Sequence, residues 1–257
     1  MEKEKVILLH GMGGTGTLWR PITASLEDEF DVLALDQIGH GKNRGAHVGF
    51  APLDYGNDTV RVMGSSGFHP AWVVGHSMGV RTACALAHLK PEWVRGLVLV
   101  DLGLSGIAGG GLGESLSAFL RVLPEKLNSR AEAREFMKQN CPDSSIAQYL
   151  MAVSVAAPNG EVTFPFDHES LLKTLEAARG FDLRPWVQEC SERGIPVLAL
   201  RGANSKVWSK EEYEAERARF AGVTLVTFKE IEGAGHGLPF EKRQEFVAEL
   251  KSFTSAR

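Results

Sequence analysis

The chain has 257 residues, 44% of them hydrophobic and 23% charged, which is the composition of an ordinary globular enzyme with one large domain or one domain carrying an insertion. Its formal net charge of −4 gives no basic surface for a polyanion, so we expect no nucleic-acid partner. No apolar run approaches the roughly 18 residues that a membrane-spanning helix needs, so we expect no membrane partner either.

The chain start and the cysteines bear on the compartment and on metals. Residues Met1–Lys5 are charged and lead directly into an apolar segment, without the apolar core and small-residue cleavage site of a secretory leader. Cys84, Cys141 and Cys190 are odd in number and widely spaced, which fits neither a disulfide framework nor a zinc site. We therefore expect a cytoplasmic protein that holds no metal.

Six short apolar runs predict the strands of a sheet. In chain order they are Val6–Leu9, Val32–Leu35, Trp72–Val74, Leu97–Val100, Val197–Leu200 and Thr224–Phe228. Runs that are apolar on both faces are typical of parallel strands covered by helices. Helical patterns lie at Met78–Leu89, Ser209–Phe220 and Glu241–Phe253. This alternation predicts an α/β fold with a doubly wound, mostly parallel sheet.

The stretch between Asp101 and Pro196 interrupts the alternation, because no strand is predicted in it. Its amphipathic segments are helical: Leu116–Leu123, Arg130–Gln139, Ser144–Val155 and Glu169–Ala178. A single crossover needs only about a dozen residues, so we expect an inserted helical cap, with ordinary crossover helices as the alternative. The predicted organisation is a core of residues 1–102 and 188–257 and a cap of residues 103–187.

The segment Gly75–Gly79 has the pattern Gly-x-Ser-x-Gly, which is weak evidence alone and needs its context. Here Trp72–Val74 predicts a strand before it and Val80–Leu89 a helix after it. Such a sharp turn leaves no room for flanking side chains and lifts the hydroxyl of Ser77 clear of the sheet. The N–H of Met78 then lies at a helix N-terminus, where it can bind a developing oxyanion. Ser77 is the candidate nucleophile; a serine that only caps the helix is the alternative.

A second oxyanion donor is expected from the glycine-rich loop His10–Thr15, where Met12 is placed to turn its N–H toward the nucleophile. The loop matches neither a P-loop nor a dinucleotide fingerprint, so no cofactor is predicted. Of the eight histidines, His236 comes directly after the last predicted strand. Its two flanking glycines let the imidazole turn toward Ser77. His236 is therefore the candidate general base.

These motifs together resemble the α/β-hydrolase superfamily over essentially the whole chain. The resemblance rests on His10–Gly14, Asp36–Gly41, Gly75–Gly79 and Gly235-His236, in that order. It implies Ser77 as nucleophile, His236 as base, and the N–H groups of Met12 and Met78 as oxyanion hole, with a cap near residues 103–187. A serine nucleophile excludes the haloalkane dehalogenase and epoxide hydrolase chemistry of this superfamily, which needs a carboxylate nucleophile.

The acid of the expected triad departs from the family pattern. Members usually carry an aspartate at or near the position of Lys206, in the loop Leu200–Ser209. A lysine cannot accept the imidazole Nδ1–H, and its charge opposes the imidazolium that forms in the transition state. The usual acid is therefore missing.

Asp101, at the end of the predicted strand Leu97–Val100, is the best substitute. That strand should lie beside the elbow strand, about 4.8 Å away, with its carboxyl end at the same edge as Ser77. In this relocated aspartate and in the later Ser-Lys pair, short stretches of the chain resemble the 2-(acetamidomethylene)succinate hydrolases. A turn or capping role for Asp101 is the alternative, and Glu230 and Glu232 are weaker candidates for the acid.

The sequence therefore predicts a cofactor-independent serine hydrolase that cleaves an ester, thioester, amide or carbon–carbon bond next to a carbonyl through an acyl-enzyme. A small, partly apolar substrate is expected from the cap aromatics, although packing explains most of them: Phe119, Phe136, Tyr149, Phe164, Phe166 and Trp186. The alternatives are a non-hydrolytic ligand-binding member of the fold, or a lyase or acyltransferase. The oligomeric state stays open.

Overall fold

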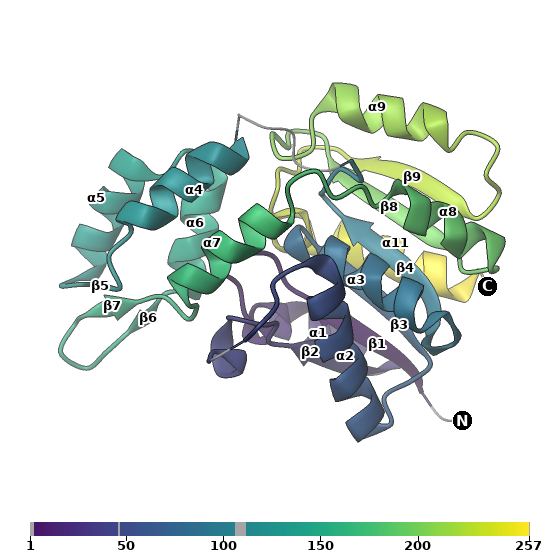
Figure 1. Cartoon of the computed structure of the whole chain (residues 1–257), viewed down its shortest axis with the longest axis horizontal. Helices are drawn as coiled ribbons and strands as arrows, with labels where there is room; N and C mark the ends of the chain where they lie inside the picture. The colour runs from purple at the N-terminus through teal and green to yellow at the C-terminus, as the bar shows by residue number, and fades with distance from the viewer. Residues whose placement is uncertain (1–2, 46, 106–111, 257) are drawn as a thin grey trace.

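The computed structural model describes residues 3–45, 47–105 and 112–256 (Figure 1), so residues 1–2 of the predicted chain start and 106–111 of the predicted cap lie outside it. Six parallel strands form the central sheet in the order β2-β1-β3-β4-β8-β9. They are β1 Glu4–Leu9, β2 Phe30–Leu35, β3 Ala71–His76, β4 Val94–Val100, β8 Val197–Gly202 and β9 Val226–Ile231. The predicted α/β fold with a mostly parallel sheet is confirmed.

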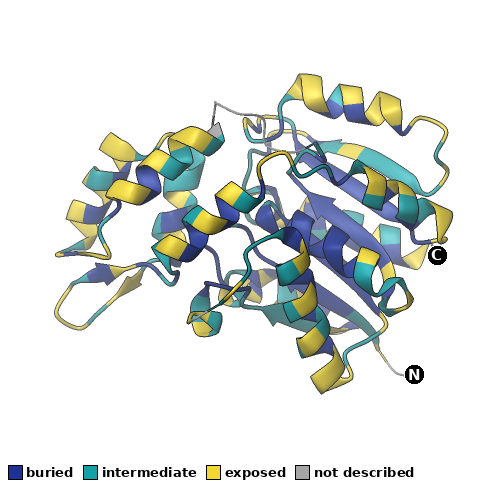
Figure 2. Ribbon diagram, in the orientation of Figure 1, coloured by how far each residue is buried: buried dark blue, intermediate teal, exposed yellow. Residues whose placement is uncertain are grey.

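Helices bury both faces of this sheet, as its two-sided apolar strands require. In β1, Ile7 and Leu9 pack on the face covered by helices α2 (Pro52–Ser66), α3 (Met78–Leu89) and α8 (Arg184–Glu192). Val6 and Leu8 pack on the opposite face, which helices α1 (Arg20–Leu26) and α11 (Arg243–Ser255) cover. Figure 2 shows the resulting contrast between buried strands and exposed outer helix faces. The helices around the sheet are η1 Gly16–Trp19, α1 Arg20–Leu26, η2 Gly41–Asn43, α2 Pro52–Ser66, α3 Met78–Leu89, η3 Pro91–Trp93, α8 Arg184–Glu192, α9 Lys210–Arg219, α10 Leu238–Glu241 and α11 Arg243–Ser255.

A second group of helices lies to one side of the sheet, at the left of Figure 1. It consists of α4 Leu112–Val122, α5 Arg130–Asn140, α6 Ser144–Val153 and α7 His168–Ala177. These helices share their own apolar core, which includes Phe119, Met137 and Leu171. We call residues 112–177 the cap lobe. Helix α8, in contrast, packs Val187 and Cys190 into the apolar core that α3 shares with the sheet. The predicted boundary between cap and core, at residue 187, falls within this helix and stays a prediction.

One expectation for the cap lobe is wrong. The sequence predicts no strand between Asp101 and Pro196, but β5 Lys126–Leu127, β6 Val155–Ala156 and β7 Val162–Thr163 form a small antiparallel sheet in the order β5-β7-β6. Strands of two residues leave no periodic pattern in the sequence, because alternation needs at least four residues to be recognised.

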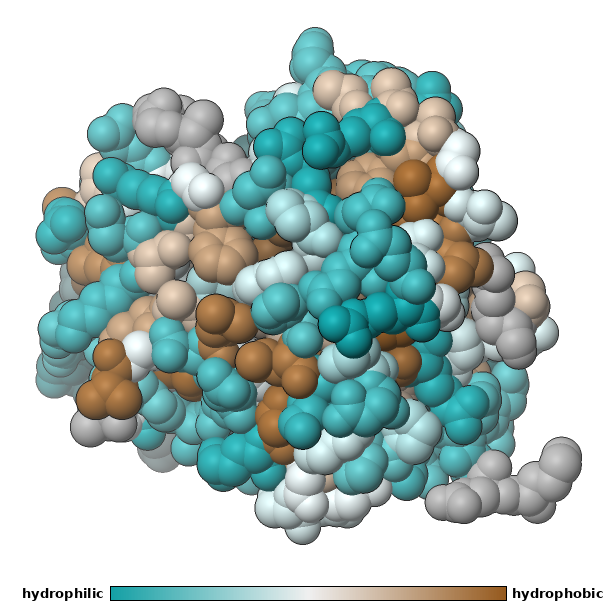
Figure 3. All heavy atoms as spheres, turned by 45° about the vertical axis from the view of Figure 1, so that its right-hand side comes forward, coloured by the Kyte–Doolittle hydropathy of each residue, from teal (hydrophilic) through white to brown (hydrophobic). Residues whose placement is uncertain are grey.

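Among the described residues, the exposed large apolar side chains are Val48, Leu53, Val122 and Val155. On the face shown in Figure 3, hydrophobic residues form small groups among hydrophilic ones. Within the described ranges, no helix has the length and apolar character needed to cross a membrane.

Candidate active site

Ser77 occupies the turn between β3 and α3. Its backbone has φ 54° and ψ −119°, which is a strained conformation for a residue with a side chain. The flanking glycines are required by close backbone contacts: a Cβ at Gly75 would lie 2.2 Å from the carbonyl oxygen of Gly79, and a Cβ at Gly79 would lie 2.4 Å from that of Leu9. Any larger residue would push α3 away from the sheet, so the sequence pattern and the geometry of the turn have the same steric cause.

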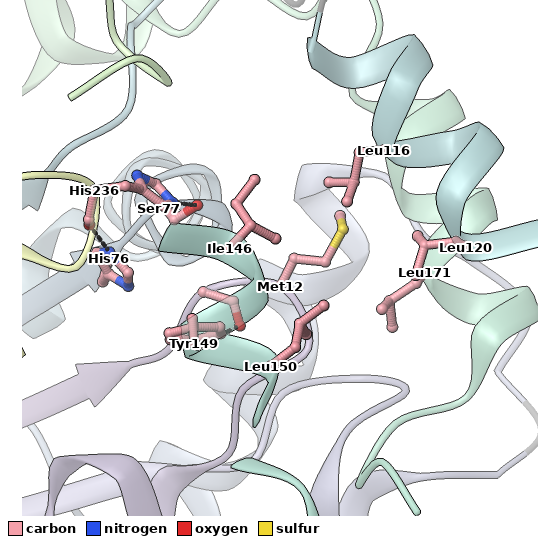
Figure 4. Close-up of a pocket in the computed structure, with 11 residues that line it drawn as sticks. Met12, His76, Ser77, Leu116, Leu120, Ile146, Tyr149, Leu150, Leu171 and His236 are labelled. Atoms are coloured by element: carbon pink, nitrogen blue, oxygen red, sulfur yellow. Dashed lines mark hydrogen bonds between the residues drawn. The ribbon is translucent and has the colours of Figure 1, made fainter. Parts of the chain in front are cut away.

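Two hydrogen bonds connect Ser77 through His236 to Asp101. The Nε2 of His236 lies 3.0 Å from the Oγ of Ser77, and its Nδ1 lies 2.8 Å from the Oδ2 of Asp101. His236 follows β9, and its own carbonyl oxygen accepts a hydrogen bond of 2.7 Å from the Nε2 of His76 (Figure 4). The three side chains that the sequence singled out are therefore brought together at the carboxyl edge of the sheet.

Asp101 is fully buried directly after β4, in the left-handed region with φ 55°. Its Oδ1 accepts from the N–H of Gly202 at 2.9 Å, and its Oδ2 accepts from the hydroxyl of Ser205 as well as from His236. A buried carboxylate needs such donors to offset its lost hydration. Neither Gly202 nor Ser205 was predicted as a partner of Asp101, although both belong to the loop Leu200–Ser209.

The other acid candidates lie elsewhere. Glu230 on β9 pairs with Arg201 at 2.5 Å and with Lys210 at 2.9 Å. These two cations occupy its carboxylate, and no hydrogen bond joins Glu230 or Glu232 to His236 among the described residues. Lys206 follows Ser205 in the chain. The hydroxyl of Ser205 donates a hydrogen bond to Asp101, whereas the ammonium of Lys206 takes no part in that contact.

The segments that carry the two predicted oxyanion donors, Met12 and Met78, adjoin Ser77. Met78 is the first residue of α3, so its N–H has no acceptor within the helix. The loop before Met12 approaches from the other side, because a Cβ at Gly11 would lie 3.1 Å from the Cβ of Ser77. Two backbone N–H groups thus come from segments that adjoin the hydroxyl.

Three histidines near the site are buried and neutral. Burial lowers the pKa of His10 to about 4, and the pKa values of His40 and His76 to about 3. An imidazole that loses its hydration cannot carry a charge without a carboxylate partner. Of the histidines at the site, His236 alone among the described residues bonds to a carboxylate, that of Asp101.

A cavity of about 50 Å³ opens at Ser77, between the sheet edge and the cap lobe (Figure 4). The aliphatic side chains around it are Met12, Leu116, Leu120, Ile146, Leu150 and Leu171. Tyr149 also lines it, whereas the other cap aromatics Phe119, Phe136, Phe164 and Phe166 pack within the cap lobe. Trp186 lies on α8, where it stacks on His88.

A metal centre is not apparent in residues 3–45, 47–105 and 112–256, where no group of three or more histidine, cysteine, aspartate or glutamate side chains could hold an ion. The features that are present, a strand–serine–helix turn at the carboxyl edge of a parallel sheet with a helical lobe above it, define a hydrolase-type α/β fold. A profile of the alpha/beta hydrolase family matches residues 6–250, and the chain belongs to that family.

Known proteins support the same assignment. The chain is 26% identical to the sn-1-specific diacylglycerol lipase ABHD11 of Mus musculus over 256 residues, which cover 96% of this chain and 80% of that protein. It is 30% identical to a 2-(acetamidomethylene)succinate hydrolase of Mesorhizobium japonicum over 96 residues, 37% of this chain and 34% of that one. The crystal structure of E-2-(acetamidomethylene)succinate hydrolase matches with a TM-score of 0.79 and 21% identity, over 99% of this chain and 93% of that chain, which shows a shared fold. The chain is a hydrolase, and both resemblances predicted from the sequence are confirmed.

Proposed function

We propose that the chain is a serine hydrolase that works through an acyl-enzyme, with Ser77, His236 and Asp101 as its catalytic triad. The observation that carries this proposal is the continuous hydrogen-bonded chain from Asp101 through His236 to Ser77. In acylation, the Nε2 of His236 takes the proton of Ser77 as its Oγ attacks the substrate carbonyl carbon. Asp101 holds the ring in the tautomer that leaves Nε2 free and stabilises the imidazolium.

The N–H groups of Met12 and Met78 bind the oxyanion of the tetrahedral intermediate. Each such donor contributes about 10²–10³-fold to the rate, because it is already oriented when the negative charge develops. His236 then returns the proton to the leaving group, which departs as an alcohol, thiol or amine. In the second half, His236 takes a proton from water as the water oxygen attacks the acyl carbon. When this intermediate collapses, His236 returns that proton to the Oγ of Ser77, which releases the acid and restores the free serine.

The cavity supports a neutral, apolar acyl group. Its aliphatic lining offers dispersion contacts and no compensation for a buried charge. Among the described residues, no lysine or arginine lines it. The diacylglycerol lipase to which the chain is similar acts, by its name, on an ester. We therefore favour a short-chain or medium-chain ester over an amide, a thioester or a dicarboxylic acid.

Labelling and ester hydrolysis test the proposal directly. The intact protein is treated with a fluorophosphonate probe and assayed with p-nitrophenyl esters of rising acyl length. We expect the wild type to be labelled and to hydrolyse these esters, Ser77→Ala to lose both properties, and His236→Ala to lose measurable labelling while still folding. Ser25→Ala, on an exposed part of α1, is the matched control and should behave like the wild type.

The outcomes separate the alternatives. Labelling of Ser77→Ala at the wild-type rate would remove Ser77 as nucleophile. A wild type that binds apolar acids or esters but neither reacts with the probe nor turns over would be a ligand-binding member of the fold. Transfer of the acyl group to an added alcohol in preference to water would make the chain an acyltransferase.

A further inference from the structure

The loop that carries Met12, residues Gly11–Gly14, is in direct contact with helix α6 of the cap lobe. We call it the oxyanion loop. The hydroxyl of Tyr149 donates a hydrogen bond of 3.2 Å to the carbonyl oxygen of Gly11. A Cβ at Gly14 would lie 2.1 Å from that hydroxyl oxygen, and a Cβ at Gly13 would lie 2.6 Å from the Cδ2 of Leu150. Two consecutive residues of α6 therefore occupy space that only glycines in the loop leave free.

The carbonyl oxygen of Gly11 is held by three donors. Besides Tyr149, the Nδ1–H of His10 donates to it at 2.8 Å and the N–H of Gly14 at 3.0 Å. This carbonyl and the N–H of Met12 belong to one peptide unit, which is planar and trans, so the two groups point in opposite directions. Fixing the direction of the Gly11 oxygen consequently fixes the direction of the Met12 N–H.

The next peptide unit is fixed from the sheet side. The N–H of Gly13 donates to the Nε2 of His40 at 2.9 Å, and the Nδ1–H of the same ring donates to the carbonyl oxygen of Ile38 at 2.8 Å. One accepting and one donating nitrogen is the pattern of neutral imidazole. Both peptide units that flank Met12 thus have a side-chain partner, one from the cap lobe and one from the core.

We propose that Tyr149 is a positioning residue of the reaction, which acts through the Gly11–Met12 peptide to aim and polarise the Met12 N–H. The inference rests on the proposed function, since Met12 matters only if an oxyanion forms at Ser77. Hydrogen bonds in series strengthen one another, so donation by the Tyr149 hydroxyl makes the N–H on the far side of the peptide a better donor. The cap lobe then contributes to the chemical step as well as to the shape of the cavity.

The protonation state of the tyrosine supports this arrangement. Its side chain lines the cavity, and burial raises the pKa of Tyr149 above its ordinary value of 10.0. The phenol therefore keeps its proton throughout the working range of a histidine base. Tyr55 provides a comparison, because its hydroxyl also joins core to cap lobe, through hydrogen bonds of 2.6 Å to the Oγ1 of Thr174 and 3.3 Å to the carbonyl oxygen of Ile38. Among the described residues, it makes no hydrogen bond to the oxyanion loop itself.

The test compares Tyr149→Phe with Tyr55→Phe in the intact protein, using p-nitrophenyl acetate and a trifluoromethyl ketone, which forms an oxyanion on a serine nucleophile. We expect Tyr149→Phe to lower kcat roughly 5-fold with little change in KM, since one hydrogen bond is worth about 1 kcal/mol and about 1.4 kcal/mol is tenfold. Affinity for the trifluoromethyl ketone should fall by the same factor. Tyr55→Phe should lower kcat and ketone affinity clearly less than Tyr149→Phe does, because its hydroxyl reaches the oxyanion loop only through Ile38 and His40.

Three results would overturn the inference. They are a wild-type kcat in Tyr149→Phe, a loss confined to KM, and an equal loss in Tyr55→Phe, which would show general loosening of the cap lobe. The proposed function stands or falls separately, because a Ser77→Ala variant that is inactive beside a fully active Tyr149→Phe variant would reject the positioning role alone. A second variant, His40→Gln, keeps an acceptor for the Gly13 N–H and should retain more activity than His40→Leu.

Discussion

The sheet-bearing core and the cap lobe contribute to the site in different ways. The core supplies the polar groups, and two of these, Ser77 and Asp101, stand at backbone positions with positive φ that follow strand ends. The cap lobe supplies mostly aliphatic side chains from helices, and its own strands are two residues long. Strained positions persist only where the surrounding structure determines them, as parallel strands do here. We infer from this comparison that the core holds the reacting groups and that the cap lobe shapes the cavity for the acyl group, with Tyr149 as one of the links between the two.

The largest expected decrease in kcat comes from a substitution in the core, at Asp101. Asp101→Asn should lower kcat for ester hydrolysis by a factor of the order of 10⁴, as expected where an aspartate fixes the histidine tautomer. An asparagine amide can present its N–H to the ring, which favours the wrong tautomer, and it cannot stabilise the imidazolium. Steady-state kinetics with p-nitrophenyl butyrate measures the effect.

Lys206→Ala is the control for this prediction. Lys206 occupies the position where family members usually carry the acid, but its ammonium takes no part in the bonds to His236, so its loss should change kcat less than severalfold. If Asp101→Asn leaves kcat nearly unchanged and Glu230→Gln lowers it strongly, the acid of the triad would instead be Glu230 on the last strand. If neither Asp101→Asn nor Glu230→Gln changes kcat while Ser77→Ala is inactive, the enzyme would work with a serine–histidine dyad.

Loss of the Ser205 hydroxyl, which donates a hydrogen bond to Asp101, should give the next largest decrease in kcat. The hydroxyl of Ser205 donates to the same Oδ2 that His236 uses, so Ser205→Ala leaves the carboxylate with one fewer donor and a less defined orientation. A hydrogen bond to a charged group contributes about 1.5–3 kcal/mol, and we expect kcat to fall roughly 10-fold. Ser205→Thr keeps the hydroxyl and should recover most of the activity. If the alanine and threonine variants are equally impaired, packing and not the hydrogen bond explains the loss.

Local sequence patterns predict some features of the site and miss others. The serine turn could be predicted because a strand, two glycines and a helix are contiguous in the chain, and the site of Asp101 because neighbouring parallel strands end at one edge. Helix α3 was predicted with its observed bounds, Met78–Leu89. Contacts made by side chains that are distant in the chain leave no local pattern, which is why Ser205 on Asp101 and Tyr149 on Gly11 were missed.

Local sequence patterns also fail to predict helices whose formation depends on tertiary packing. Helices α1, α2 and α8 were not predicted. Helix α2 contains Gly56 and Gly64, which lower helix propensity, yet Gly56 is needed where the helix crosses α3, because a Cβ there would lie 2.8 Å from that of Ala85. The close approach of two helices against the sheet therefore overrides the composition of the segment. The roles of Ser77, His236 and Asp101 stay predictions until the variants are measured.

The cap half of the comparison is tested by filling the cavity. Ile146 lies on α6, lines the cavity and is partly exposed, so a larger side chain can be accommodated there without disturbing the core. Ile146→Phe should lower kcat/KM for octanoate relative to acetate severalfold to 10-fold, since one methylene in an apolar pocket is worth about 1–3 kcal/mol. Ile146→Val, which enlarges the cavity slightly, should shift the ratio the other way. An unchanged chain-length profile in both variants would remove this cavity as the acyl site.

The smallest expected effect concerns the junction of the two halves, where the chain leaves β4 for the cap lobe. Glu216 on α9 accepts hydrogen bonds from the N–H groups of Leu104 at 2.8 Å and Ser105 at 3.0 Å through one oxygen. Its other oxygen is buried without a hydrogen-bond partner among the described residues. Burial raises the pKa of Glu216 to about 7, whereas an unperturbed carboxyl titrates near 4.5. Between these values the folded state binds a proton that the unfolded chain has released.

The free energy of unfolding contributed by Glu216 therefore falls as the pH rises from about 4.5 to about 7, by at most about 1.4 kcal/mol per unit of pH. Glu216→Gln cannot titrate and still offers an oxygen to Leu104 and Ser105, so its stability relative to the wild type should be higher at pH 8 than at pH 5. Urea unfolding at the two pH values measures this difference, in which the titration of the buried histidines cancels. Glu211→Gln, an exposed carboxyl on the same helix, should show the same difference at both pH values. Equal differences for Glu216→Gln at pH 5 and pH 8 would mean that this carboxyl ionises normally and that it holds the junction as a fully charged acceptor.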